Sequence, residues 1–362
     1  MPRPATIAAL RRQIDRLDDR MLGLLNRRAR LVQAIGTAKA RARAKVYAPA
    51  REKAVLGRLV DANRGPLTDA HVGAIFREVI SASRSLEQRL RVAYLGPRAT
   101  YTHLAAMAQL GSAADYAPAA TIAEVFHDVE NGRAHLGVVP IENSTEGGVA
   151  HTLDLLVDSP LQICAEIMLP VRHCLLAKRG TTLARLKRVV AHPQAFPQCR
   201  QWLATHLPGV PFIEMSSNTR AAERAAAEAG TAAIASSAAA TAYRLSILAD
   251  GIQDDAGNTT RFLVLASADA PAPSGDDKTS LVVSVRDEVG VLAKLLRPFA
   301  QHAIDLIKIE SRPLRERPWE YYFFLDLRGH RTDRRVARAL AAVARRALRA
   351  KVLGSYPAAT PG

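Results

Sequence analysis

The sequence predicts a multidomain protein in which an all-α segment precedes an α/β segment and a small α+β segment. Apolar residues recur every three or four positions over the first ninety residues, and from Arg91 short apolar strands alternate with helical stretches. From Ser280 the pattern changes again, to a β-α-β-β-α-β order. The expected units are 1–90, 91–268 and 279–356, with a linker at 269–278 that is rich in Asp, Pro and Ala.

Residues 1–90 are expected to form three helices, of which the first is unusually long. Its apolar stripe runs from about residue 6 to residue 44, before Pro49 prevents continuation. Such a helix would be roughly 55 Å long at 1.5 Å per residue. Two shorter helices at 50–63 and 69–88 cannot cover the whole stripe. We therefore expect a helical partner, as in an intertwined dimer.

The other two segments are read from short runs of apolar residues. In the α/β segment we expect strands at 92–95, 136–139, 188–191, 232–235 and 262–266, and helices at 122–131 and 219–229. In the last segment we expect strands at 280–285, 304–310, 321–327 and 352–356, and helices at 290–302 and 332–350. The last order is ferredoxin-like.

Composition narrows the classes of function. The net charge of +16 comes from arginines scattered over amphipathic helices, without interleaved aromatics or a nucleic-acid motif, so we expect no nucleic-acid partner. No apolar run approaches the roughly 20 residues that span a bilayer, and the N-terminus lacks the apolar core of a signal peptide. Cys164, Cys174 and Cys199 show no C-x-x-C spacing, which favours a reduced cytoplasm.

Two polar runs lie directly against apolar strands. Residues 140–148 read Pro-Ile-Glu-Asn-Ser-Thr-Glu-Gly-Gly, and residues 258–262 read Asn-Thr-Thr-Arg-Phe. Strand ends that open into polar loops are where α/β folds bind ligands. Together with Gly96-Pro97 and Thr100-Tyr101-Thr102, these runs resemble the prephenate dehydratases over about 91–268. The resemblance implies two α/β lobes with a cleft between them, as in periplasmic ligand-binding proteins.

The resemblance also implies a reaction. Prephenate loses a carboxylate and a hydroxyl to give phenylpyruvate, carbon dioxide and water, which requires one proton donor and hydrogen bonds to both carboxylates. Aromatisation drives the reaction, so no metal or organic cofactor is expected. Thr260 is the family's candidate acid, and Arg261 provides a charge for the substrate or for loop order. The other expected substrate-binding residues are Thr100, Thr102, Glu142, Asn143, Ser144, Gln194, Gln198, Ser217, Asn218 and Phe262.

Two residues depart from the dehydratase pattern. Ala99 stands where the family's G-P-x-G-T-[FY]-[ST] run has glycine, and alanine is unfavourable there if the position requires a positive φ. Ala191 stands where a hydroxyl sometimes precedes His192-Pro-Gln194. We expect at worst a reduced dehydratase activity from these changes.

The helical segment resembles the all-helical chorismate mutases. The matching residues are Leu10-Arg11, Leu17-Asp18, Arg28, Gly36-x-Ala38-Lys39, Arg51-Glu52, Ser83 and Glu87. Chorismate rearranges to prephenate when two carboxylates are held and charge on the ether oxygen is stabilised. By resemblance, Arg28 and a second copy's Arg11 hold carboxylates and Lys39 donates to the ether oxygen. Glu52 takes the ring hydroxyl, with Arg51 and Ser83 in support.

Arg11 and Glu87 carry separate expectations. Arg11 lies roughly 25 Å along the helix from Arg28, so it would serve a neighbouring chain's site. Glu87 stands where the family has a Gln donor, so it must be protonated when it acts; Gln88 turns about 100° away from Ser83 and Glu87. Ala48 stands where some members carry Asp, so that contact is missing or moved.

Residues 279–356 resemble an ACT domain, a ligand-responsive ferredoxin-like module. Gly290-Val-Leu292 replaces the usual G-A-L, and Glu310-Ser-Arg-Pro313 is intact. A glycine that opens a helix presents backbone N–H groups to a carboxylate. In the family, paired modules bind phenylalanine at their interface. The expected effector-binding residues are Gly290, Val291, Leu292, Glu310 and Ser311.

From end to end the chain resembles the bifunctional chorismate mutase–prephenate dehydratases that phenylalanine inhibits. The expected partners are therefore chorismate, prephenate, phenylalanine and further copies of the chain, as a dimer or a higher oligomer. Two alternatives stay open. One is a monofunctional prephenate or arogenate dehydratase whose helical segment only dimerises, and the other is a non-enzymatic amino-acid-binding regulator.

Overall fold

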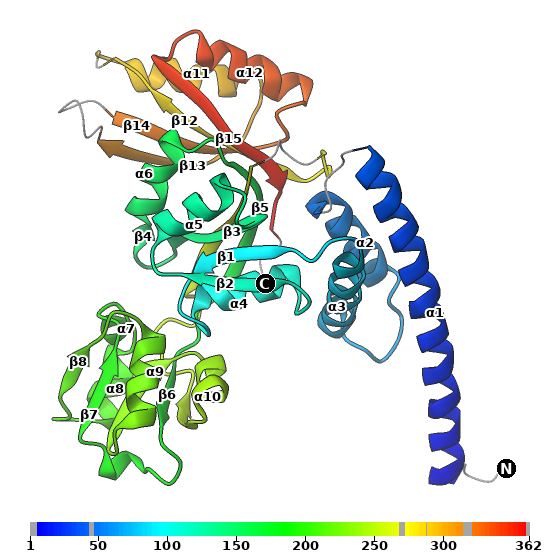
Figure 1. Ribbon diagram of the computed structural model, residues 1–362. Helices are drawn as coiled ribbons and strands as arrows, with labels where there is room; N and C mark the ends of the chain where they lie inside the picture. Colours follow the sequence, from blue (N-terminus) through cyan, green and yellow to red (C-terminus); the bar gives the residue numbers. More distant parts are fainter. Residues whose placement is uncertain (1–5, 43–46, 268–271, 287, 314–320, 360–362) are drawn as a thin grey trace. The chain divides into compact units, whose positions relative to one another are not determined.

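The computed structural model describes residues 6–42, 47–267, 272–286, 288–313 and 321–359 (Figure 1). The chain divides into two compact units. The first unit contains Met1–Ala48, Ala54–Leu90 and Leu110–Asp115, and the second contains Pro49–Lys53, Arg91–Gln109 and Tyr116–Gly362. Residues 269–271, the start of the expected linker, lie outside the described residues.

Three helices form the N-terminal region, as expected. They are α1 (Ile7–Arg41), α2 (Pro49–Asp61) and α3 (Asp69–Glu87). Thr68 caps α3 because its hydroxyl accepts a hydrogen bond from the backbone N–H of His71. Gly36 lets α3 approach α1 closely, since a Cβ at that position would lie 3.0 Å from Cγ of Glu87.

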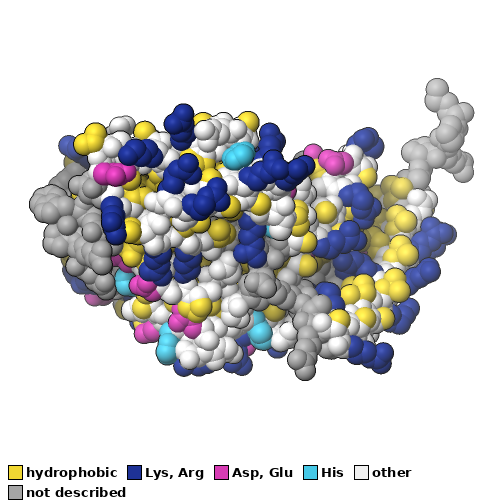
Figure 2. Space-filling view, turned by 90° about the horizontal axis from the view of Figure 1, so that it is seen from above, with side chains coloured by type: hydrophobic (Ala, Val, Ile, Leu, Met, Phe, Trp, Pro, Cys, Tyr) yellow, Lys and Arg dark blue, Asp and Glu magenta, His cyan; other side chains and the backbone are white. Residues whose placement is uncertain are grey.

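The apolar stripe of α1 is exposed along most of its length. Leu17 is 54% exposed, Leu24 65% and Leu31 62%. In Figure 2 the helix at the right of the view carries hydrophobic side chains beside Lys and Arg side chains. An exposed apolar surface of this length is typical of an interface. Among the described residues, no helix is long and apolar enough to cross a membrane.

The first α/β lobe is built on a sheet of order β2-β1-β3-β11-β5, with β4 paired to β3. Strands β1 and β3 are parallel, whereas β11 runs antiparallel to both β3 and β5. The strands are β1 (Arg91–Leu95), β2 (Asp115–Ala119), β3 (Leu136–Asn143), β4 (Gly147–Gly148), β5 (Gln162–Pro170) and β11 (Thr259–Ala266). The helices of this lobe are α4 (Tyr101–Leu110), α5 (Ile122–Glu130) and α6 (Ala150–Asp158).

The second lobe has a sheet of order β10-β6-β9-β7-β8. Its strands are β6 (Cys174–Ala177), β7 (Arg188–Ala191), β8 (Phe212–Glu214), β9 (Thr231–Ala235) and β10 (Ser246–Asp250). Its helices are α7 (Ala195–Gln198), α8 (Arg200–His206), α9 (Asn218–Ala227) and α10 (Ser237–Tyr243), with a 3-10 turn at Leu183–Arg185. The chain enters this lobe after β5 and returns before β11, so two connections join the lobes.

The C-terminal domain has the expected ferredoxin-like topology, with sheet order β13-β14-β12-β15. Its elements are β12 (Asp277–Ser284), α11 (Val291–Gln301), β13 (Leu306–Pro313), β14 (Tyr321–Arg328), α12 (Arg334–Ala344) and β15 (Arg349–Pro357). Two expected boundaries were wrong. Asp277 and Lys278, expected in the linker, belong to β12, and the last helix ends at Ala344 instead of residue 350. Pairing of β15 with β12 begins at Arg349 opposite Ser284, so the sheet takes the residues that helical periodicity assigned to α12.

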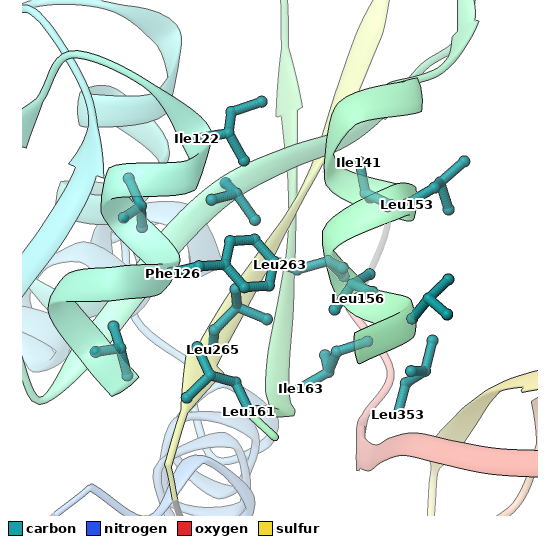
Figure 3. Packing of buried hydrophobic residues seen from close by; sticks show 14 of the residues in the cluster. Ile122, Phe126, Ile141, Leu153, Leu156, Leu161, Ile163, Leu263, Leu265 and Leu353 are labelled. Atoms are coloured by element: carbon teal, nitrogen blue, oxygen red, sulfur yellow. The ribbon is translucent and has the colours of Figure 1, made fainter. Parts of the chain in front are cut away.

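The first lobe and the C-terminal domain share one hydrophobic core. Phe126, Ile141 and Leu156 of the lobe lie in the same buried cluster as Leu353 and Tyr356 of β15. Figure 3 shows Leu353 reaching from β15 toward α6 and the side chains of the lobe. The C-terminal domain is therefore packed onto the sheet that carries both polar motifs.

Candidate active sites

The two polar motifs of the dehydratase segment lie side by side in the first lobe. We expected loops, but β3 extends to Asn143 and β11 begins at Thr259, so the motifs are largely strand residues. In the register of this antiparallel pair, Thr260 is opposite Asn143 and Arg261 is opposite Glu142. Successive residues of a strand point to opposite faces of the sheet. One cross-strand pair therefore faces one side, and the next pair faces the other.

Hydrogen bonds fix the orientation of the Asn143 amide. Its Oδ1 accepts from the backbone N–H of Thr145 at 3.0 Å, from the Thr145 hydroxyl at 2.7 Å and from the backbone N–H of Glu146 at 3.2 Å. Its Nδ2 therefore donates, to Thr260 Oγ1 at 2.9 Å and to Asn258 Oδ1 at 2.8 Å. Because Thr260 accepts a hydrogen bond from Asn143, its own hydroxyl proton is left for another acceptor.

The network continues from Asn258 into the second lobe. Asn258 is 1% exposed, and its Nδ2 donates to Gln198 Oε1 at 3.1 Å. The Gln198 amide donates in turn to Glu146 Oε1 at 2.7 Å, which sets its orientation. His173 Nε2 also lies 2.8 Å from Gln198 Oε1. Since that oxygen can only accept, His173 carries its proton on Nε2.

Asn258, His173 and Tyr101 are functional candidates to which the sequence analysis gave no role. The Tyr101 hydroxyl lies 3.1 Å from His173 Nδ1 and 2.7 Å from the carbonyl oxygen of Arg172. Burial lowers the pKa of His173 and outweighs the hydrogen bond that its Nε2–H donates to Gln198, so the imidazole is held neutral. Asn258 begins the Asn-Thr-Thr-Arg-Phe run and was within reach of the sequence analysis. A lone histidine in Val171-Arg-His-Cys-Leu gives no such signal.

Three expected substrate ligands do not face this network. The Arg261 guanidinium donates to Glu166, to Asp326 and to the Tyr356 hydroxyl, on the side of the C-terminal domain. Glu142 forms an ion pair with Lys308 of β13 at 2.9 Å. Phe262 is only 1% exposed and is part of the protein interior. Strand alternation explains the first two corrections, because Glu142 and Arg261 are the neighbours of Asn143 and Thr260.

The remaining dehydratase residues form a second group or support the backbone. Ser144 Oγ accepts from the backbone N–H of Thr259 at 3.0 Å, which ties the two motifs together. Ser217 caps α9 by accepting from the backbone N–H of Arg220, and Asn218 Oδ1 accepts from the backbone N–H of His192 at 2.8 Å. The Thr100 hydroxyl donates to the Leu95 carbonyl oxygen. Thr102 lies buried in α4, and Gln194 is exposed before α7.

The backbone at Ala99 has a positive φ of 68°, the conformation for which glycine is favoured. Ala99 is 5% exposed and packs in the core cluster of the second lobe, with Val190 and Ala221. Its carbonyl oxygen accepts from the Ser236 hydroxyl at 3.2 Å. The departure from the family pattern therefore creates backbone strain, and burial of the methyl group partly compensates for it.

In the helical unit, two cations of α1 meet α3. Arg28 donates to the hydroxyl of Ser83, and Lys39 Nζ lies 3.0 Å from Glu87 Oε2. Ser83 and Glu87 are four residues apart and share a helix face, as expected. Gln88 is the C-terminal cap of α3 and has extended backbone angles. Glu87 therefore occupies the position next to Lys39.

The other expected mutase residues lie on parts of the chain away from Arg28 and Lys39. Arg11 lies exposed near the start of α1. Arg51 and Glu52 lie in the first turn of α2, within the segment 49–53 that belongs to the second unit. Arg51 is exposed and Glu52 is half-buried.

The expected effector residues lie on two elements of the C-terminal domain. Gly290 is the N-cap of α11 and has a φ of 78°, followed by half-buried Val291 and exposed Leu292. Glu310 and Ser311 lie on β13, the edge strand of the sheet. Ser311 is exposed, whereas Glu310 pairs with Lys308 at 2.9 Å.

Known proteins match the chain in all three segments. The family model described as chorismate mutase type II matches residues 10–88, that of prephenate dehydratase matches 92–270, and that of the ACT domain matches 279–345. A crystal structure of prephenate dehydratase in complex with L-Phe from Arthrobacter aurescens is 36% identical with a TM-score of 0.71, covering 75% of this chain and 92% of that one. The structure of GqqA, described as a novel type of quorum quenching acylase, is 31% identical with a TM-score of 0.68, covering 74% of this chain and 98% of that one.

Two curated relatives align over almost the entire chain. The bifunctional chorismate mutase/prephenate dehydratase of Stutzerimonas stutzeri is 44% identical over 358 residues, covering 98% of both chains. The enzyme of the same description from Aquifex aeolicus is 44% identical over 354 residues, covering 97% of both. Because these matches join the helical, α/β and C-terminal segments in one order, the chain belongs to the bifunctional chorismate mutase/prephenate dehydratase family.

Proposed function

We propose that the protein converts chorismate to prephenate in its helical unit and prephenate to phenylpyruvate, carbon dioxide and water in its α/β lobes. Residues 1–90 form the mutase, 91–268 the dehydratase and 279–356 the regulatory domain. Phenylalanine is the feedback inhibitor of the dehydratase. The protein acts in the cytoplasm, where biosynthetic enzymes of this kind meet their substrates. Neither reaction needs a cofactor, since one is a rearrangement and the other is driven by aromatisation.

In the dehydratase, Thr260 protonates the leaving hydroxyl of prephenate. The observation that carries this assignment is the amide orientation of Asn143, which donates to Thr260 Oγ1 at 2.9 Å and leaves the threonine proton for the substrate. A threonine hydroxyl is a weak acid, so its position must compensate. Asn258 and Gln198 hold Asn143 in place through the network described above.

The cluster around Thr260 is largely neutral, and this neutrality also fits the chemistry. Arg261 is turned away and His173 is neutral, so the side chains next to Thr260 are amides and hydroxyls. A cation at the departing carboxylate would stabilise the substrate more than the transition state, in which that charge disperses into carbon dioxide. Hydrogen bonds from neutral donors orient the carboxylate without that penalty. Ser217 and Asn218 of the second lobe are the proposed donors for the other carboxylate.

In the mutase, Arg28 and Lys39 hold the substrate's anionic groups and the ether oxygen. Glu87 is the partner of Lys39, at 3.0 Å, and bound chorismate replaces part of that interaction. Arg11 joins the site from a second copy of the chain. The exposed stripe of α1 fits this partner, because an antiparallel α1 would cover apolar side chains such as Leu17 and Leu24, which are 54% and 65% exposed.

The test is an assay of the purified protein on each substrate, with size measured by light scattering. We expect chorismate consumption and phenylpyruvate formation as separable activities of a dimer or larger oligomer, and inhibition of the second activity by phenylalanine. Phenylpyruvate formation without chorismate consumption would leave only the monofunctional alternative. Phenylalanine binding without turnover of either substrate would refute both enzymatic assignments.

A further inference from the structure

The strand pair β3–β11 presents different chemistry on its two faces. Asn143 and Thr260 lie opposite each other and form the proposed acid site. The next cross-strand pair projects to the other face. It consists of Glu142, which precedes Asn143 on β3, and Arg261, which follows Thr260 on β11. There they contact residues of the C-terminal domain. On each strand, the residue of the proposed acid site is therefore directly adjacent to the residue that contacts the C-terminal domain.

Arg261 uses all three nitrogens of its guanidinium in this contact. Nε donates to Glu166 Oε2 at 2.8 Å, Nη1 to Asp326 Oδ2 at 2.6 Å and Nη2 to the Tyr356 hydroxyl at 2.9 Å. Glu166 belongs to β5 of the same lobe, whereas Asp326 and Tyr356 belong to β14 and β15 of the C-terminal domain. Arg261 is 8% exposed. A buried arginine with three oriented acceptors fixes the backbone to which it is attached.

A second contact reaches β3 from the strand that carries the expected effector motif. Side chains on β13 alternate, so that Lys308 and Glu310 face the lobe while Ser311 is exposed. Lys308 pairs with Glu142 at 2.9 Å and with Glu310 at 2.9 Å. The Glu310 carboxylate lies so close to Gly148 that a Cβ on this glycine would be 2.1 Å from Oε1. The motif residues of β13 therefore pack directly on the loop that follows Asn143.

We propose that Arg261 and Glu142 are positioning residues that hold Thr260 and Asn143 in place, and that Lys308, Asp326 and Tyr356 of the C-terminal domain set that position. The proposal rests on the function proposed above, in which Thr260 is the acid. A ligand that shifts β13 would pull on Glu142, and the displacement would reach Asn143 through one peptide unit. Ligand control requires only that phenylalanine prefers the arrangement in which the Asn143–Thr260 hydrogen bond is lengthened.

Two conservative variants test the proposal in the full-length protein. Tyr356→Phe removes one acceptor of Arg261 and keeps the packing of the ring, and Lys308→Met removes the ion pair with Glu142 and keeps most of the stem. The matched control is Arg349→Met, which removes an ion pair of 2.9 Å between β15 and Asp158 of α6, in the same interface but away from β3 and β11. Lys308→Arg should retain the contact with Glu142.

We expect kcat of the dehydratase to fall about tenfold in Tyr356→Phe and in Lys308→Met, with KM for prephenate changed less than about threefold, because positioning acts on the chemical step. Maximal inhibition by phenylalanine should be weaker in both variants, while calorimetry still detects phenylalanine binding. Lys308→Arg and Arg349→Met should behave like the wild type. Mutase activity on chorismate, measured on the same samples, normalises the enzyme concentration.

If both variants retain the kcat and the maximal inhibition of the Arg349→Met control, the contacts are only structural and the proposal is wrong, even if the thermal midpoint falls. If one variant fails to fold, the other decides the outcome alone. A wild-type protein that does not convert prephenate would refute the proposed function. That result is distinct from a wild type that converts prephenate while the variants match it.

Discussion

The cluster of Arg28, Lys39 and Glu87, proposed for the mutase, and the cluster around Thr260, proposed for the dehydratase, meet opposite electrostatic requirements. Arg28 and Lys39 are cations on a partly exposed helix, and Lys39 keeps the counter-ion Glu87 at 3.0 Å. The groups that contact Thr260 are amides and hydroxyls at a strand pair, and the neighbouring Arg261 is turned to the other face. The rearrangement needs charge to hold a dianion and stabilise an oxygen. The dehydration needs one well-placed proton and a carboxylate that is free to leave. The helical segment must therefore place positive charges next to its substrate, whereas the α/β segment must orient hydrogen-bond donors.

The largest effect should come from removing the proton donor. Thr260→Ala should lower kcat of the dehydratase by about 10²–10⁴-fold, the usual contribution of a general acid, and leave the mutase rate unchanged. Thr260→Ser keeps the hydroxyl and the acceptor for Asn143, so it should retain most of the activity. Phenylpyruvate formation from added prephenate gives the rate. Equal activity in the alanine and serine variants would remove Thr260 from the mechanism.

A slightly smaller effect is expected at the charged site. Arg28→Ala should reduce kcat/KM for chorismate by about 10²–10³-fold, because it removes the cation that holds and positions a substrate carboxylate. Arg30→Ala, a change at an exposed arginine two residues away, is the control and should have little effect. Because Arg28 also donates to Ser83, Ser83→Ala should cause a smaller loss. A dehydratase rate that falls in parallel with the mutase rate would contradict independent sites.

Two buried histidines of the second unit predict how its stability responds to acid. Burial is the main cause that lowers the pKa of His173 and of His103, and the charge of Arg98 adds to the effect on His103. The unfolded chain takes up protons on these histidines below about pH 6.5, whereas the folded chain does not. The free energy of unfolding should therefore be highest above about pH 6.5 and decrease as pH falls below it. Each histidine contributes at most about 1.4 kcal/mol per pH unit.

The measurement is urea unfolding followed by tryptophan fluorescence at several pH values. Trp202 lies on α8 in the second unit, so its fluorescence reports on the unfolding of the second lobe. His173→Gln removes one titrating group and should make the pH dependence between about pH 5 and 6.5 shallower. An identical pH dependence in the wild type and in His173→Gln would mean that folding does not lower the pKa of His173.

Periodicity and motif order predicted the elements well, and they predicted some of the contacts. The helices of the first unit, the α/β alternation and the ferredoxin-like order follow from repeats of apolar residues, because burial of one face requires such repeats. The division into two lobes was expected only from the family resemblance. Asn143 and Thr260 were expected in one site, and they share a hydrogen bond. The direction of Arg261 was not predicted. It depends on strand alternation, and the sequence analysis had placed Arg261 in a loop.

The sequence analysis also treated the C-terminal segment as a separable module, and its packing shows why this is incomplete. Val282, Phe324 and Leu353 belong to the core of the first lobe, and Arg261 takes acceptors from both parts. A chain that ends near Ala270 would expose these apolar contacts and leave Arg261 and Glu166 with fewer partners. Nothing in the local sequence around residues 269–278 indicates a shared core, because it arises from contacts between residues far apart in the chain. Point variants in the interface are therefore better tests than truncation.

The smallest effect is expected where the backbone departs from the family pattern. Ala99→Gly should relieve the left-handed strain of Ala99, whose φ is 68°, by about 1–2 kcal/mol. The same change loses about 0.8 kcal/mol from the buried methyl group and about 0.4–1 kcal/mol from the greater freedom of glycine in the unfolded chain. These contributions nearly cancel, so the free energy of unfolding should change by less than about 1 kcal/mol.

Ala99→Val keeps the strain and adds a branched Cβ in a site that is 5% exposed, so it should destabilise the second unit by about 1–3 kcal/mol or more. Urea unfolding of both variants tests whether burial of the methyl group compensates for the strain at Ala99. A stabilisation well above about 1 kcal/mol in Ala99→Gly would show that the methyl group contributes little to packing in the second lobe and leaves the strain uncompensated.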